Sequence, residues 1–180
     1  MILTALDLEM NQPSGKIIQI GAVMGDLHTG KILDRVNCLI NSGEQLNPFI
    51  TDLTGITDKM IYEEGIDIVD AYELLNSSHK KHNAFMNPIT WGGGDSIELK
   101  EQLPKEIDWC FGRRWIDCKT LYISIRLANG QKLQGGLAKA MTKFGLNFEG
   151  RKHNALDDAY NTFRFYRRLV QLMPKMDKGE

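Results

Sequence analysis

Three apolar runs in the first forty residues constrain the fold more than any other feature of this sequence. They span residues 2–8, 16–24 and 32–40, and each is rich in Ile, Leu or Val. Turn-forming residues such as Asn, Pro, Gly and Asp separate them at 11–15 and 26–30. Short apolar runs joined by short turns are typical of strands, so we predict three strands in an antiparallel meander.

After residue 40 the pattern changes to helical segments that alternate with short strands. One strand is expected to end at Trp91 and another to lie within 109–117. Helices are expected from Pro48 onward and at 58–62, 67–78, 97–103 (with Ser96 as the cap), 118–128, 133–144 and 155–173. This order predicts an α/β fold with a mixed five-stranded sheet flanked by helices. We expect one domain over residues 1–180, with 174–180 as a frayed polar tail.

Composition narrows the possible functions and locations. The net charge of −1 argues against bulk binding of long duplex nucleic acid, whose affinity comes largely from cationic side chains on phosphates. This net charge is compatible with binding of a few nucleotides at a chain end. No apolar run approaches about 20 residues, so we expect no membrane span, and with no secretory signal a cytoplasmic protein. Both a monomer and a homodimer remain open.

The segment from Gly150 to Thr162 joins a loop histidine to the last predicted helix. Asn154 is a suitable N-cap, and Asp157 then falls at the third helical position, which is close to a capping box. His153 would lie on the approach to the helix and Asp158 on its first turn. This arrangement can direct an imidazole and a carboxylate toward one point.

Three further acidic residues lie at the ends of predicted elements. Asp7 and Glu9 end the first strand, where residues two apart project from the same face. Asp95 follows the Gly92–Gly94 turn after the fourth strand. Together with Asp158 they offer hard oxygen ligands, which suit Mg²⁺ or Mn²⁺. Two such ions can hold a phosphodiester and activate water, and His153 has the intrinsic pKa, about 6.5, of a base near neutral pH.

Each of these residues also has an ordinary structural explanation. Asp7 and Glu9 could be solvent-facing residues at a strand end, because Asp and Glu are usually exposed. Asp95 could serve the glycine turn, and Asp158 could interact with the helix dipole. His153 could be a surface loop residue. The joint pattern, rather than any single residue, favours a metal-dependent site.

The joint pattern resembles the DEDDh family of 3′-to-5′ exonucleases, which have the ribonuclease H-like fold. The first family motif, Asp-x-Glu, is met by Asp7-Leu8-Glu9. The second, an aspartate after the fourth strand, is met by Asp95. The third, His-x4-Asp, is met by His153 and Asp158. Order, spacing and predicted context agree over essentially the whole chain.

The resemblance implies roles for individual residues. The four carboxylates would organise two Mg²⁺ or Mn²⁺ ions, and His153 would be the general base. Met10 and Asn11 would lie against the terminal nucleotide. Ile56 would wedge against a terminal base, with a core isoleucine as the alternative. The implied substrate is the 3′ end of single-stranded RNA or DNA, released as 5′-mononucleotides.

One departure leaves the substrate sugar open. Many relatives have His-Asn-x-x-Phe-Asp around the second motif, where this chain has three glycines between Trp91 and Asp95. This form resembles the branch with histone-mRNA and small-RNA 3′ exonucleases, and also certain phage exonucleases. Two other classes of protein remain as alternatives: a nucleic-acid-binding module of this fold that has lost catalysis, and a protein unrelated to nucleic acid in which the motifs occur by chance.

Overall fold

The predicted meander forms the centre of the molecule. The computed structural model describes residues 1–132 and 135–173, and it contains strands β1 (Ile2–Met10), β2 (Ile17–Asp26) and β3 (Ile32–Leu39). Strand β1 pairs antiparallel with β2, and β2 pairs antiparallel with β3. The expectation of three antiparallel strands is confirmed.

Two short strands complete the sheet on the other side of β1. Strands β4 (Ile89–Thr90) and β5 (Ile116–Asp117) are parallel to β1, and the strand order is β3-β2-β1-β4-β5. Pro88 lies just before β4, so its missing N–H removes no ladder bond, and its carbonyl accepts a hydrogen bond from the Ile116 N–H at 2.8 Å. The predicted mixed five-stranded sheet is therefore confirmed.

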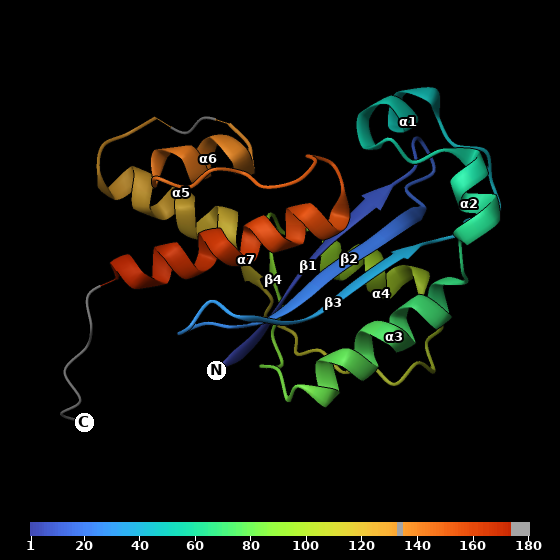
Figure 1. Cartoon of the computed structure of the whole chain (residues 1–180), viewed down its shortest axis with the longest axis horizontal. Helices are drawn as coiled ribbons and strands as arrows, with labels where there is room; N and C mark the ends of the chain where they lie inside the picture. The colour runs from blue at the N-terminus through green and yellow to red at the C-terminus, as the bar shows by residue number, and fades with distance from the viewer. Residues whose placement is uncertain (133–134, 174–180) are drawn as a thin grey trace.

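Helices cover both faces of this sheet (Figure 1). Helix α7 crosses one face, with α5 and α6 beyond it, while α3 and α4 lie on the other. The helices are α1 (Pro48–Thr54), α2 (Asp58–Glu64), α3 (Ile68–Lys81), α4 (Asp95–Gln102), α5 (Cys118–Ala128), α6 (Leu137–Lys143) and α7 (Ala155–Leu172).

Alternation along β1 explains why both faces are covered. Leu3 and Ala5 pack in the core cluster that contains α7, whereas Leu6 and Leu8 pack in the cluster that contains α3 and α4. Successive side chains of a strand point to opposite faces, so a strand buried on both sides reads as one apolar run. The same alternation assigns Asp7, which follows Ala5 by two residues, to the α7 face.

Some predicted helix ends differ from the structure. Helix α4 begins at Asp95 with Gly94 in the cap position, so Ser96 lies inside the helix and is not its cap. Helix α6 begins at Leu137, because Gly135 has φ +87° and Gly136 is extended. Residues 133–134 of that predicted helix, and the predicted tail at 174–180, lie outside the described residues. Within the described residues, no helix combines the length and apolarity needed to cross a membrane.

Candidate active site

The end of β1 places two carboxylates side by side on the α7 face. Asp7 pairs with Gly21 across the β1–β2 ladder, and Glu9 pairs with Gln19. Both carboxylates are partly buried. Because β2 presents no side chain at Gly21 and a neutral amide at Gln19, the two acidic groups have no opposite charge directly across the ladder.

The start of α7 brings the third motif to the same point. Asn154 is the N-cap, and its side chain accepts a hydrogen bond from the Asp157 N–H. The backbone N–H of His153 donates to Oδ2 of Asp158 at 2.7 Å, and His153 has φ +60°. The loop therefore folds back onto the first helical turn, which holds the histidine beside Asp158.

Half of the expected capping-box arrangement is present at this helix, namely the hydrogen bond from the Asp157 N–H to the Asn154 side chain. The carboxylate of Asp157 accepts a hydrogen bond from the Arg151 N–H at 2.8 Å instead of reaching back to Asn154. Gly150 has φ +84°, and a Cβ there would lie 2.4 Å from Cγ of Asp157. Asp157 has a structural role in shaping the loop before His153.

Asp95 reaches the site because β4 runs parallel to β1. It is the first residue of α4 and follows the Gly92–Gly94 turn, in which Gly92 has φ +114°. Burial raises the pKa of Asp95 to about 6, backbone N–H groups of Asp95 and Leu8 oppose that rise, and Asp117 adds to it. The carboxylate therefore lies beside the end of β1.

Asp117 is an acidic neighbour that the sequence interpretation did not single out. It caps α5, accepting hydrogen bonds from the backbone N–H groups of Lys119 and Thr120 and from the Thr120 hydroxyl. The available signal was an Asp directly before the helix predicted at residue 118. Asp117 adds negative charge beside Asp95 while its oxygens are occupied as a cap.

The electrostatics of the cluster are dominated by burial and mutual repulsion. The pKa of Asp7 is raised well above its usual range by burial, then by the charges of Asp95, Asp158 and Glu9. Burial raises the pKa of Glu9 to about 7, with Asp158 and Asp95 adding to the shift. Burial also raises the pKa of Asp158, against the His153 N–H that lowers it. Opposite charge near these groups would relieve the repulsion.

The donor set fits divalent cations. Ligand atoms of Glu9, His153 and Asp158 all lie within 4.8 Å of one another. Asp7 and Asp95 add carboxylates that repel these groups, and oxygen ligands of this kind suit Mg²⁺ or Mn²⁺. The structure thus brings the predicted residues together, and it brings the imidazole nearer to a ligand position than the sequence interpretation required.

A small cavity opens beside His153 and Asp158. It has a volume of about 220 Å³, and Phe148, Lys139 and Lys152 form part of its wall, together with Gly136, Leu137 and Ala138. The wall combines an aromatic ring with two cations, which are the groups that contact bases and phosphates.

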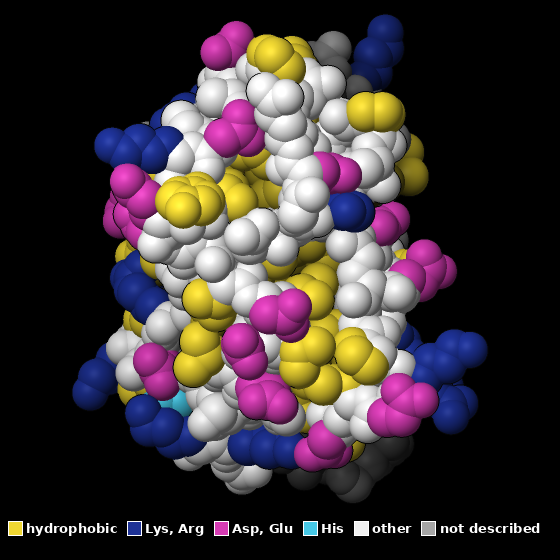
Figure 2. Space-filling view, turned by 90° about the vertical axis from the view of Figure 1, so that its right-hand side faces the viewer, with side chains coloured by type: hydrophobic (Ala, Val, Ile, Leu, Met, Phe, Trp, Pro, Cys, Tyr) yellow, Lys and Arg dark blue, Asp and Glu magenta, His cyan; other side chains and the backbone are white. Residues whose placement is uncertain are grey.

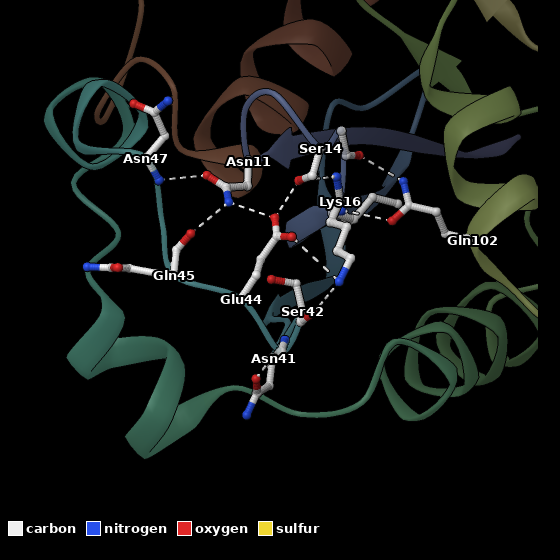
Figure 3. Close-up of polar contacts among 12 residues, drawn as sticks. Asn11, Ser14, Lys16, Asn41, Ser42, Glu44, Gln45, Asn47 and Gln102 are labelled. Atoms are coloured by element: carbon white, nitrogen blue, oxygen red, sulfur yellow. Dashed lines mark hydrogen bonds and ion pairs between the residues drawn. The ribbon is translucent and has the colours of Figure 1, made fainter.

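Asn11 is buried in a network of polar contacts. It is 3% exposed, and its Nδ2 donates to Oε1 of Glu44 at 2.7 Å and to the Gln45 carbonyl at 3.1 Å. Its Oδ1 accepts from the Asn47 N–H at 2.8 Å. Figure 3 shows this network, in which Ser14 and Lys16 also reach Glu44. Asn11 holds the β1–β2 turn against residues 44–47.

Met10 and Ile56 also have packing roles. Met10 is partly buried and packs against the core cluster on the α3 and α4 face. Ile56 is 2% exposed and packs with Ile18, Ile50 and Ile61. This burial corresponds to the core alternative, so the structure gives the predicted wedge no exposed side chain.

The sheet order and the helices on both of its faces define a ribonuclease H-like fold, and comparison with known proteins gives the family. Residues 4–166 match the RNase_T exonuclease family, and the chain belongs to it. The nuclease domain of 3′hExo, described as a DEDDh family member bound to rAMP, has a TM-score of 0.76 at 21% identity, with 94% of this chain and 92% of that chain covered.

Curated relatives are similar over most of this chain but are longer proteins. ERI1 exoribonuclease 2 of Xenopus laevis is 26% identical over 180 residues, which covers 86% of this chain and 25% of the relative. The PolC-type DNA polymerase III of Thermotoga petrophila is 29% identical over 178 residues, which covers 96% of this chain and 12% of that polymerase. The chain thus spans a quarter or less of the length of these two relatives.

Proposed function

We propose that this chain hydrolyses the 3′-terminal phosphodiester of single-stranded nucleic acid and releases 5′-mononucleotides. The observation that carries the proposal is the convergence of Asp7, Glu9, Asp95, Asp158 and His153 at one end of the sheet. Membership of the exonuclease family supports it.

Two Mg²⁺ or Mn²⁺ ions would be held by Asp7, Glu9, Asp95 and Asp158. When bound, such ions stabilise charge on a phosphate, lower the pKa of water and steady a leaving oxygen. The carboxylates themselves orient around a common point because two strand ends and two helix starts meet there. Binding of cations would offset the repulsion that raises the pKa values of Asp7 and Glu9.

His153 would accept the proton of the attacking water. Its side chain is exposed, on a loop whose backbone is held to Asp158 by the His153 N–H. A general base must reach the reacting water, and an exposed imidazole on this loop meets that need. The fixed backbone directs the ring toward Glu9 and Asp158.

The substrate would be a chain end rather than a long duplex. The net charge is −1, and Figure 2 shows one face where acidic and hydrophobic side chains occupy the middle and Lys and Arg lie mostly around the outline. Such a face offers no broad phosphate-binding surface. One similar protein is named an exoribonuclease and another a DNA polymerase, so both sugars belong to the proposal.

The test uses matched 5′-labelled RNA and DNA oligonucleotides with a 3′-hydroxyl or a 3′-phosphate, and circular single strands, in Mg²⁺, Mn²⁺ or chelator. We expect stepwise shortening from the 3′-hydroxyl, 5′-mononucleotide products and no cleavage in chelator or by Asp7→Asn. Cleavage of circles would indicate an endonuclease. Binding of oligonucleotides without hydrolysis in either metal would indicate a module that has lost catalysis.

A further inference from the structure

Gln19 on β2 uses both ends of its side-chain amide in contacts to other elements. The residue is 1% exposed. Its Oε1 accepts a hydrogen bond from the Ala155 N–H at 3.0 Å, and its Nε2 donates to Oδ1 of Asn37 at 2.8 Å. A backbone N–H can only donate, so the amide must present its oxygen to Ala155 and its NH₂ group to Asn37.

These contacts join the two halves of the candidate active site. Gln19 pairs with Glu9 across the β1–β2 ladder. Ala155 is the first residue of α7, and its N–H is one of the amides that an α-helix cannot satisfy internally. Asp158 follows three residues later on the same helical turn. Gln19 therefore ties the helix start that carries Asp158 to the strand position opposite Glu9.

The backbone next to Gln19 lies very close to the start of α7. A Cβ on Gly21 would lie 2.1 Å from the carbonyl carbon of Ala155, so the helix start rests directly on the strand. Gly21 permits the approach, but a glycine supplies no side chain that fixes where the helix sits. The hydrogen bond from Ala155 to Gln19 supplies that fixed point.

We infer that Gln19 is a positioning residue, which sets the separation between the Asp7–Glu9 pair and the Asp158–His153 pair. Asn37 orients the Gln19 amide from β3, where it lines a cavity of about 370 Å³ together with Arg151 and Asn154. The inference rests on the proposed function, since the separation matters for holding cations and for placing His153.

The expected size of the effect follows from similar arrangements in metal sites. Groups that orient the ligands of a metal usually change metal affinity or activity by about 10- to 100-fold when they are removed. Gln19→Met keeps the length of the side chain and removes both hydrogen bonds. We expect kcat and the Mn²⁺ affinity of the metal-free protein each to fall by about 10- to 100-fold, with the oligonucleotide KM within about two-fold of wild type.

Gln19→Glu is the rescue variant. Its carboxylate can still accept from the Ala155 N–H, and a helix N-terminus favours negative charge there. Amide hydrogen exchange of Ala155 should be fast in Gln19→Met and slow again in Gln19→Glu. Only part of kcat should be recovered, because the new carboxylate lies opposite Glu9 and adds to the repulsion there. Asn37→Ala leaves the main tie in place, so it should change kcat and Mn²⁺ affinity in the same direction but less. It serves as the second variant if Gln19→Met does not fold.

Thr4→Val is the matched control. Thr4 is fully buried on β1, and its hydroxyl lies 2.8 Å from Nδ1 of His79 on α3, which packs on the sheet face opposite α7. It should lose stability and keep wild-type kcat and Mn²⁺ affinity. If Gln19→Met does the same, Gln19 serves only the fold and the inference is wrong. If the wild type proves inactive but Gln19→Met weakens Mn²⁺ binding and exposes Ala155, the proposed function fails and the positioning role stands.

Discussion

Gly21 lies directly under Ala155, so closely that a Cβ on Gly21 would be 2.1 Å from the Ala155 carbonyl carbon. Because Gly21 also pairs with Asp7, this one position joins β1, β2 and the start of α7. A second glycine on β2, Gly25, makes a similar approach to the ring of Phe163. The carboxylates of Asp7 and Asp158 are near each other because the helix rests on strand backbone rather than on side chains.

Gly21→Ala should destabilise the protein and displace α7. The added methyl meets backbone atoms, which cannot rotate away, and overpacking of this kind costs about 1–3 kcal/mol or more. Urea unfolding measures the change. Gly136→Ala is the matched control, because φ there is −79° and, among described residues, nothing lies within 4 Å of its added Cβ. Wild-type stability of Gly21→Ala would show that α7 can shift without cost.

Asp7→Asn should abolish turnover and raise the stability of the metal-free protein. The amide removes a charge that burial and three neighbouring carboxylates disfavour, and it also removes a predicted ligand of both cations. Thermal unfolding in chelator and oligonucleotide hydrolysis in Mg²⁺ are the two measurements. Asp52→Asn, on the exposed side of α1, should change neither. A destabilised Asp7→Asn would mean that Asp7 is stabilised by contacts unrelated to cations.

The stability gap between Asp7→Asn and wild type should widen as pH rises. Glu9 and Asp95 have folded-state pKa values raised to about 7 and about 6 from 4.5 and 3.8, so the folded state holds protons that the unfolded state has released. Stability from these groups is present at low pH and lost as pH rises through that window. Asp7 also has a raised folded-state pKa, chiefly because of burial, so Asp7→Asn removes the loss of stability that Asp7 itself causes as pH rises.

Comparing Asp7→Asn with the wild type cancels the titration of His79, which affects the stability of both proteins in the opposite direction. Burial lowers the pKa of His79, which makes both proteins more stable as pH rises through the ordinary histidine range. Asp34, with its pKa lowered to about 2 chiefly by the Ser78 hydroxyl, is ionised in both states throughout the window. The difference in melting temperature in chelator, measured between about pH 5 and 7.5, should therefore grow with pH. In saturating Mn²⁺ it should shrink or change sign, because the wild type keeps a predicted ligand that Asp7→Asn lacks. A constant difference would contradict the repulsion among the carboxylates.

Ile56→Ala should lower the stability of the protein more than it weakens substrate binding. Ile56 is 2% exposed among Ile18, Ile50 and Ile61, and truncation of a buried isoleucine typically costs about 2–5 kcal/mol. Ile56→Val should cost about 0.5–1.5 kcal/mol. Urea unfolding and oligonucleotide KM on the same samples separate the two roles. An increase in KM without a loss of stability would show that Ile56 contacts the substrate as a wedge.

The sequence predicted the sheet because β1, β2 and β3 are long, apolar and separated by turn residues. It also placed Asp7 and Glu9 on one face, since strand alternation is local information. The start of α4 was predicted two residues too late, at residue 97 instead of Asp95, because Gly94 occupies the cap position and no side-chain signal marks it. The Asp-x-Glu motif, the aspartate after the fourth strand and the His-x4-Asp motif together predicted the exonuclease family.

The contacts that the sequence did not reveal are those made between distant segments. Asn11 follows the Asp-x-Glu motif closely, but its partners are Glu44, Gln45 and Asn47, more than 30 positions away. Gln19 reads as one polar residue inside an apolar strand, and only the packed helix shows that it meets Ala155. Tertiary contacts of this kind determine whether a residue beside a motif faces the substrate or the core.

His153 provides the last and most discriminating prediction. If it removes the proton from the attacking water, single-turnover rates at saturating Mn²⁺ should rise with pH and then level off, because only the neutral imidazole can act as the base. His153→Asn is the cleaner variant, because His153 has φ +60° and asparagine tolerates that conformation better than alanine does. The rate should fall by about 10²- to 10⁴-fold and the pH limb should flatten.

Mn²⁺ affinity then decides whether the imidazole is a base or a ligand. Ligand atoms of His153, Glu9 and Asp158 lie within 4.8 Å of one another, so the geometry brings the imidazole within reach of an ion that the two carboxylates hold. A base role requires that His153→Asn bind Mn²⁺ as tightly as wild type, since carboxylate oxygens are the preferred ligands of this ion. The backbone bond from residue 153 to Asp158 does not depend on the side chain, so the variant should keep Asp158 in place. A variant that loses Mn²⁺ binding and keeps the wild-type pH limb would make His153 a ligand, and the proton would then have to leave through another group.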